Sequence, residues 1–237
     1  MVSISLKNVS VHYPVFSSSK DISIKNKVFK KLIGGHLFTH ENTGSKYIKA
    51  LSDINLTINS GDRVGLTGLN GSGKSTLLKV FSGALEPTIG KVTTTGKISS
   101  MIEFSMGLDG ELTAIENILL RAGLKNMKKN ETENFIFDVI NFSDLQEFKN
   151  IQVCQYSSGM QLRLAYSMAT YQSADILIMD EIVFVGDEDF TKKIKKNLDV
   201  LIDKSKILII ASHNHMLLKS YCNKFINLKK GSITENQ

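Results

Sequence analysis

The stretch 68–76 reads Gly-Leu-Asn-Gly-Ser-Gly-Lys-Ser-Thr and matches the pattern G-x-x-x-x-G-K-[ST]. This pattern constrains the fold more than any other feature, because it works only between a buried strand and the start of a helix. The apolar run 63–67 predicts the strand, and the residues 75–82 predict the helix. The sequence therefore predicts an α/β fold in which a glycine-rich loop joins these two elements.

The residue types in this loop are those that hold a phosphate chain. Glycines let backbone N–H groups curl around phosphate oxygens, and the helix start presents its positive dipole end to the anion. We expect Lys74 to reach the β- and γ-phosphates of ATP, and Ser75 to supply a hydroxyl to Mg²⁺. The residues expected to contact the nucleotide here are Gly68, Asn70, Gly71, Ser72, Gly73, Lys74, Ser75 and Thr76.

Two further apolar runs end in polar residues. The run 176–179 is followed by Asp180, expected to bind Mg²⁺ directly or through water, and by Glu181, expected to deprotonate the attacking water as general base. The run 207–211 leads to His213, expected to contact the γ-phosphate and to help hold Glu181 and the water. Alone, such endings also fit a solvated strand end or a helix start. The phosphate-binding pattern gives them their catalytic interpretation.

Apolar strand patterns alternate with helical patterns along most of the chain, which predicts a mostly parallel sheet covered on both faces. An antiparallel β edge is expected at the start of the chain, and a closing hairpin near 225–233. Several helical patterns without intervening strands predict an α-helical subdomain inserted at about 104–172, within a single domain of residues 1–237. The expected helices after the first are 113–123, 131–142, 143–149, one following Gly159, 189–203 and 213–221.

The charge distribution indicates an anionic partner. The formal net charge is +6, and the segment 14–49, an insert between the first strands, holds seven lysines against two acids. Positive charge fits a nucleotide, a nucleic acid or the inner membrane face, and does not choose among them. Within this segment the spacing of apolar and basic residues over 25–33 would give a short amphipathic helix. Both a solvated loop and a basic element at the membrane surface remain open.

Nothing in the sequence predicts direct membrane insertion. The apolar runs are far shorter than the roughly 18 residues needed to cross a bilayer, and residues 1–7 alternate like a strand instead of forming a signal-peptide core. The two cysteines form no CxxC pair, which suits a reducing compartment. We therefore expect a cytoplasmic protein whose membrane association comes through a partner or a surface segment.

The segment Tyr156-Ser157-Ser158-Gly159-Met160 resembles the signature motif of ABC ATPases, whose usual form is Leu-Ser-Gly-Gly-Gln. The chain thus resembles a P-loop NTPase of ABC type. The resemblance implies a homodimer in which Ser157, Ser158 and Gly159 of one copy clamp the γ-phosphate held by the other.

The same resemblance implies roles for three isolated residues. Tyr13 stands where the family has an aromatic ring that stacks on adenine. Glu103 stands at the Q-loop position, usually glutamine, and its carboxylate can approach Mg²⁺. Asp187 stands at the D-loop position.

The variant form of the signature resembles that of polysaccharide and teichoic-acid exporters, as do the segments 111–118 and 180–187. This implies an ATPase that drives export of a lipid-linked polysaccharide, of the O-antigen, capsule or teichoic-acid type. It also implies two copies of a transmembrane permease subunit and a peripheral position at the cytoplasmic face of the inner membrane. No nucleic-acid partner and no added C-terminal carbohydrate-binding domain are expected.

Two alternatives stay open at this point. One is a soluble ABC-type ATPase that acts on nucleic acid or ribosomes, which the basic composition allows. The other is an ABC subunit for a different transported substrate. The sequence does not reveal the sugar repeat or the lipid carrier.

Overall fold

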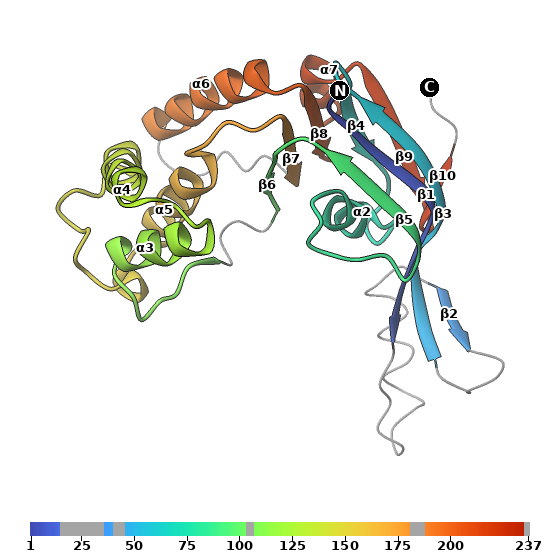
Figure 1. The fold of residues 1–237 in the computed structure, drawn as a ribbon, viewed down its shortest axis with the longest axis horizontal. Helices are drawn as coiled ribbons and strands as arrows, with labels where there is room; N and C mark the ends of the chain where they lie inside the picture. The colour runs from blue at the N-terminus through green and yellow to red at the C-terminus, as the bar shows by residue number, and fades with distance from the viewer. Residues whose placement is uncertain (15–35, 40–45, 103–106, 181–187, 235–237) are drawn as a thin grey trace. The chain divides into compact units, whose positions relative to one another are not determined.

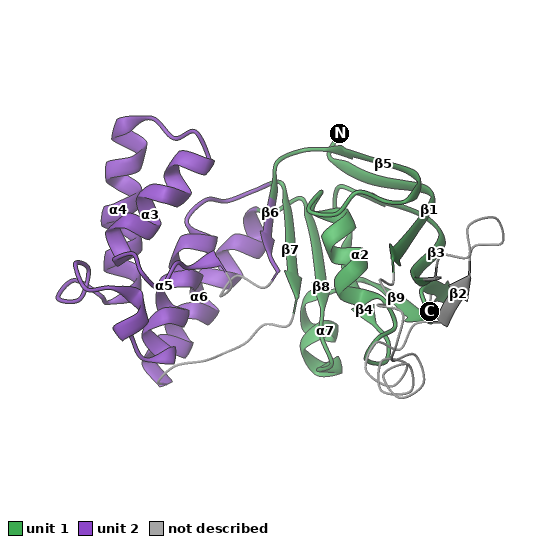
Figure 2. Cartoon of the chain, turned by 90° about the horizontal axis from the view of Figure 1, so that it is seen from below, with its two compact units in different colours: residues 1–98, 175–182, 205–237 green, residues 99–174, 183–204 purple. Residues whose placement is uncertain are grey.

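The computed structural model describes residues 1–14, 36–39, 46–102, 107–180 and 188–234 of the 237-residue chain. The chain divides into two compact units, which Figure 2 colours separately. Unit 1 comprises Met1–Ile98, Asp175–Ile182 and Ser205–Gln237, and unit 2 comprises Ser99–Ala174 and Val183–Lys204. The two are described separately below.

An antiparallel four-stranded sheet with the order β2-β3-β1-β5 opens unit 1. Its strands are β1 (Ser3–Pro14), β2 (His36–Thr39), β3 (Lys46–Asn59) and β5 (Ile89–Thr95). In β1 the apolar residues switch from even to odd positions between Leu6 and Val9, because the register shifts there and Asn8 adopts a left-handed backbone with φ 51°. All four apolar residues of this pattern, Ile4, Leu6, Val9 and Val11, are therefore buried.

The second sheet has the order β10-β9-β4-β8-β7-β6. Its strands are β4 (Arg63–Thr67), β6 (Ile98–Met101), β7 (Ile176–Asp180), β8 (Ile207–Ala211), β9 (Lys224–Lys229) and β10 (Ser232–Thr234). The β4, β7, β8 and β9 strands are parallel, and β10 folds back antiparallel to β9. Every residue of β8 is buried, as expected for a central strand of a parallel sheet. The α2 helix (Lys74–Phe81) packs against β7 and β8 and also contacts β3 and β5 (Figure 1).

Four helices form most of unit 2: α3 (Ala114–Leu124), α4 (Lys129–Ser143), α5 (Ser158–Thr170) and α6 (Glu188–Lys204). A capping box fixes the start of α3, where Thr113 Oγ1 accepts from the Glu116 N–H and the Glu116 carboxylate accepts from the Thr113 N–H. Buried apolar residues from α3, α4 and α5, among them Ile118, Phe135 and Leu164, pack into one core. A smaller cluster of Tyr166, Phe190 and Ile194 joins α6 to α5.

The predicted fold class, a mostly parallel sheet with an antiparallel edge and a helical subdomain, is confirmed by the sheet topology and the helical unit. One local prediction was wrong. No helix forms over 143–149, because Asp144 adopts a left-handed backbone with φ 57° that ends α4, and the chain continues in turns. The helix expected from 213 is α7 (His215–Tyr221), which starts later because Asn214 caps it.

Within the described ranges, no helix combines the length and the apolar character needed to span a bilayer. The basic segment 14–49 lies largely outside the described residues, and so does the short amphipathic helix expected within it.

Candidate functional site

Three neighbouring parallel strands of unit 1 end at the same level of the sheet. In the register of β4, β8 and β7, Leu66 lies beside Ala211, and Ala211 lies beside Asp180. The glycine-rich loop begins two residues after Leu66, and His213 follows two residues after Ala211. The sheet therefore brings the loop, Asp180 and His213 to one edge, the carboxyl ends of the strands, where ligands of open α/β sheets bind.

The backbone of the loop needs glycine at both ends. Gly68 has φ 143° and Gly73 has φ 108°, conformations that other residues rarely adopt. A Cβ on Gly68 would collide with the Leu228 carbonyl oxygen and lie 2.6 Å from Ser72 Oγ. A Cβ on Gly73 would lie 2.7 Å from the Ala50 carbonyl oxygen. Side chains at these positions would therefore displace the loop.

Two polar side chains inside the loop indicate an anionic ligand. Lys74 is only 9% exposed, and its ammonium donates to the carbonyl oxygens of Gly68 at 2.8 Å and Leu69 at 3.3 Å. The ammonium is thus held over the loop, where it would also contact the oxygens of a bound phosphate. Ser72 Oγ is buried and has no hydrogen-bond partner among the described residues. Buried polar groups are nearly always paired, so the Ser72 hydroxyl fits a site completed by a ligand.

Ser75, Thr76 and Asp180 offer hydroxyl and carboxylate oxygens that could hold a magnesium ion. Ser75 is exposed and Thr76 half-buried in the first turn of α2, whose N–H groups have no acceptors inside the helix. Asp180, half-buried, ends β7 at the same edge of the sheet. Oxygen atoms of these types are the ligands that Mg²⁺ prefers, so Ser75 and Asp180 fit the ion.

His213 lies on the connection between β8 and α7. Before the helix, Ser212 Oγ accepts from the Asn214 N–H at 3.1 Å, and Asn214 Oδ1 accepts from the N–H groups of Met216 and Leu217. Asn214 caps the helix, so His213 itself is an exposed connection residue rather than a helical one. Its contact with the γ-phosphate stays a prediction.

The remaining predicted residues of unit 1 are less constrained. Tyr13 lies near the end of β1, opposite Ile48 of β3, and its side chain is 38% exposed. A half-exposed ring can stack on a planar base. Asn70 and Gly71 lie on the exposed outer part of the loop, and Gly71 has φ 74°. Glu103, Glu181 and Asp187 lie outside the described residues.

The signature residues lie at the start of α5 in unit 2. Ser157 is the N-cap, and its Oγ accepts from the Met160 N–H at 3.2 Å. Ser158 is exposed and Gly159 half-buried in the first turn. Among the described residues, a Cβ on Gly159 would have only Ser157 Oγ within 4 Å, at 3.9 Å, so packing against this part of the chain does not explain the glycine. An open helix start with free space at Gly159 fits an anion brought from outside the unit.

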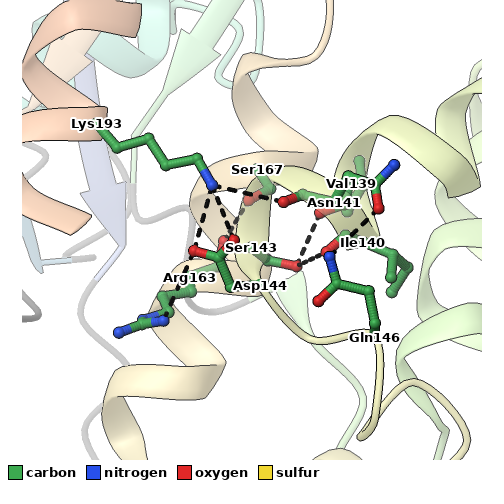
Figure 3. Close-up of polar contacts among 9 residues, drawn as sticks. All are labelled: Val139, Ile140, Asn141, Ser143, Asp144, Gln146, Arg163, Ser167 and Lys193. Carbon is green, nitrogen blue, oxygen red and sulfur yellow. Dashed lines mark hydrogen bonds and ion pairs between the residues drawn. The ribbon is translucent and has the colours of Figure 1, made fainter. Parts of the chain in front are cut away.

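Sequence reasoning missed a polar cluster that holds this helix in unit 2 (Figure 3). Asp144, at the end of α4, accepts from the Lys193 ammonium of α6 at 3.0 Å and lies 3.9 Å from the Arg163 guanidinium of α5. Arg163 also lies over the ring of Phe190 at 4.7 Å. Residues this far apart in the chain leave no local signal. The cluster joins the signature helix to its two neighbours.

A strand, a glycine-rich loop with a buried lysine and a helix, set at the carboxyl edge of a parallel sheet, define a P-loop nucleoside triphosphatase. The chain belongs to the ABC transporter family, whose model matches residues 51–183.

The relatives agree with this assignment. The chain is 34% identical to the O-antigen export system ATP-binding protein RfbE of Yersinia enterocolitica, over 99% of this chain and 98% of that protein. It is 33% identical to the teichoic acids export ATP-binding protein TagH of Listeria monocytogenes, over 99% of this chain and 66% of that protein.

Solved structures share the fold. The ATP-binding cassette MJ0796, as a dimer in a post-hydrolysis state with ADP and phosphate, is similar with a TM-score of 0.69 and 23% identity, covering 99% of this chain and 97% of that chain. An ATP-binding subunit of an ABC transporter is similar with a TM-score of 0.70 and 19% identity, covering 99% of this chain and 89% of that chain.

Proposed function

We propose that this chain is the ATP-hydrolysing subunit of an ABC exporter that moves a lipid-linked polysaccharide across the inner membrane. It is an ABC ATPase by family. The observation that carries the finer proposal is the near full-length similarity to RfbE, an O-antigen export protein, supported by the similarity to TagH, a teichoic acids export protein.

In this proposal the glycine-rich loop binds the triphosphate of ATP. Lys74 would exchange its bonds to the Gly68 and Leu69 carbonyl oxygens for bonds to the β- and γ-phosphates. The first N–H groups of α2, which have no acceptor within the helix, would donate to the same oxygens. Ser72 would gain a partner for its buried hydroxyl. Tyr13 would stack on the adenine ring.

Hydrolysis needs a base beside the γ-phosphate. Glu181, directly after Asp180, would take a proton from the water whose oxygen bonds to the γ-phosphorus while the bond to the ADP oxygen breaks. His213 would orient this water and Glu181 from the adjacent strand end. Magnesium, held by Ser75 and Asp180 with Glu103 approaching it, would neutralise charge on the phosphates.

A second copy of the chain would complete each site. The open start of α5 at Ser157, Ser158 and Gly159 supports this, because it offers N–H groups and a hydroxyl to an anion from another molecule. Asp187 would lie near the dimer axis, at the D-loop position. The dimeric cassettes among the fold relatives are consistent with such an arrangement.

The dimer is tested by sedimentation of a Glu181→Gln variant, which should hold ATP without cleaving it. We expect saturating MgATP to convert this variant from monomer to dimer, and a Ser157→Ala, Gly159→Asp double substitution added to it to prevent the conversion. A Glu181→Gln protein that stays monomeric while it binds MgATP would contradict the shared site.

The closed dimer would drive two copies of a transmembrane permease, so that the chain sits peripherally at the cytoplasmic face of the inner membrane. The basic segment 14–49 would lie near anionic headgroups or the anionic lipid-linked glycan. Polysaccharide as the cargo predicts a permease gene beside glycosyltransferase genes.

The cargo is tested in cells that lack this gene. We expect the unmodified gene to restore surface polysaccharide, and the Lys74→Ala variant to leave the lipid-linked polymer on the inner face of the membrane. Normal surface polysaccharide in the deletion strain, or ATPase activity that DNA or RNA stimulates in the purified protein, would favour the alternatives of another cargo or a nucleic-acid role.

A further inference from the structure

The turn of the hairpin formed by β9 and β10 lies directly against the glycine-rich loop, although the two are far apart in the sequence. Lys230 and Gly231 form this turn between β9 and β10, with φ 52° and 80°. The Gly231 N–H donates to the Ser72 carbonyl oxygen at 2.9 Å, and the Gly231 carbonyl oxygen accepts from the Ser52 N–H at 2.8 Å. One residue thus bonds to the loop on one side and to β3 on the other.

These three segments touch through their backbones, with no room for a side chain. A Cβ on Gly231 would lie 2.6 Å from the Ala50 carbonyl oxygen and 3.3 Å from Leu51 Cα. A Cβ on Gly73 would meet the same Ala50 oxygen at 2.7 Å and Gly231 Cα at 3.6 Å. Backbone atoms of a sheet cannot yield as the end of a flexible side chain can. A side chain at Gly231 would therefore push the turn away from the loop.

The other end of the loop rests on the same hairpin. A Cβ on Gly68 would collide with the Leu228 carbonyl oxygen in β9. Just before it, Thr67 Oγ1 donates to the Ile226 carbonyl oxygen at 3.4 Å. The hairpin therefore supports the loop at Gly68 and at Ser72, on both sides of its exposed part.

We infer that Gly231 is a positioning residue for phosphate binding, acting through the Ser72–Gly73 peptide. A trans peptide is planar, so its C=O and N–H point in opposite directions. The bond from Gly231 fixes the Ser72 C=O toward the hairpin, and this turns the Gly73 N–H away from it. Gly73 is the N-cap residue before Lys74. The turn thereby sets the direction of one loop amide and the place where α2 begins.

The test compares Gly231→Ala with Gly83→Ala in the full chain. Gly83 has φ 74°, close to the 80° of Gly231, but a Cβ there would meet no atom of the described residues within 4 Å. Both substitutions introduce the same left-handed strain, and only that at Gly231 disturbs the loop. The readouts are the Kd and KM for MgATP, kcat, and the thermal stability without nucleotide, with activity measured where all three proteins are folded.

We expect the KM and Kd for MgATP of Gly231→Ala to rise roughly 10- to 100-fold, the loss of affinity that follows when one hydrogen bond to a charged group is no longer made. Its kcat should change less, and Gly83→Ala should bind MgATP like the unmodified chain. A Kd for Gly231→Ala within about twofold of that for Gly83→Ala would overturn the inference.

Hydrogen exchange on the unmodified chain keeps the inference testable even where Gly231→Ala does not fold. MgATP should slow exchange of the Gly231 amide along with the loop amides, because binding favours the state in which the Gly231–Ser72 bond is made. The control is the Gly61 amide, another turn amide, which donates to the Lys206 carbonyl oxygen at 2.7 Å. Protection of the loop without protection of Gly231 would overturn the inference.

The inference rests on the proposed assignment of the loop as the phosphate site, and the two can fail separately. An unmodified chain that does not bind MgATP overturns both. An unmodified chain that binds MgATP beside a Gly231→Ala variant that binds equally well overturns only the role of Gly231.

Discussion

The buried hydroxyl of Ser72 leads to the prediction that its removal stabilises the nucleotide-free protein. Ser72 is 5% exposed, and its Oγ has no hydrogen-bond partner within the described part of the chain. A buried polar group without a partner costs about 1–3 kcal/mol. Replacing Ser72 with alanine removes that cost and leaves the backbone bond from its carbonyl oxygen to Gly231 intact. We therefore expect Ser72→Ala to raise the free energy of unfolding of the nucleotide-free protein.

Ser10 provides a matched control of opposite sign. It is 6% exposed, and its Oγ accepts from the Asp53 N–H at 2.9 Å. Ser10→Ala removes that hydrogen bond, so this substitution should destabilise the protein by about 1 kcal/mol.

The assay is thermal unfolding without nucleotide, followed by titration with MgATP. For a protein of this size about 1 kcal/mol corresponds to roughly 2–4 °C in Tm. Ser72→Ala should unfold at a higher temperature than the unmodified chain, and Ser10→Ala at a lower one. With MgATP bound, Ser72→Ala should instead unfold at a lower temperature than the unmodified chain. The variant then lacks a hydrogen bond to a charged group, which is worth about 1.5–3 kcal/mol. A lower Tm for nucleotide-free Ser72→Ala would refute the reasoning.

Two further predictions concern the packing of unit 2 and the acid stability of unit 1. In unit 2, the buried Tyr166 hydroxyl lies 3.2 Å from both the Ile194 carbonyl oxygen and Asn197 Oδ1. Tyr166→Phe should therefore lower the free energy of unfolding by about 1 kcal/mol. An unchanged midpoint of denaturant unfolding would contradict this. In unit 1, the bond from the Lys206 ammonium, with the Lys97 N–H, holds the pKa of the Asp175 carboxyl below its ordinary value. The stability that Asp175 contributes is present at neutral pH and lost as the pH falls below about 4, through the lowered pKa. The stability difference between the unmodified chain and Asp175→Asn should therefore shrink in that range, and a constant difference from pH 7 to pH 3 would count against it.

Much of unit 1 could be predicted because its signals are local. The buried strands β7 and β8 are continuous apolar runs, and the glycine-rich pattern needs a strand before it and a helix after it. Parallel pairing then brings Asp180 and His213 to the edge where the loop starts, without further information. The signature segment was found by its resemblance to a family motif, and the structure adds that Ser157 caps α5.

The rest depends on contacts between distant parts of the chain or on a single backbone conformation. The end of α4 at Asp144 depends on a left-handed residue that is not glycine, so the helical pattern runs past it in the sequence. The support of the loop by Gly231 joins two segments that are far apart in the sequence, and nothing in a Lys-Gly turn indicates which segment it will contact. The cluster of Asp144, Arg163 and Lys193 likewise comes from three separate helices.

Equilibrium titration of the purified chain with MgATP decides whether residues 68–76 hold the phosphates of ATP. We expect saturable binding that Lys74→Ala weakens about 10- to 100-fold, the equivalent of one charge-assisted contact of about 1.5–3 kcal/mol. Equal affinity in the two proteins, or no binding by the unmodified chain, would contradict it.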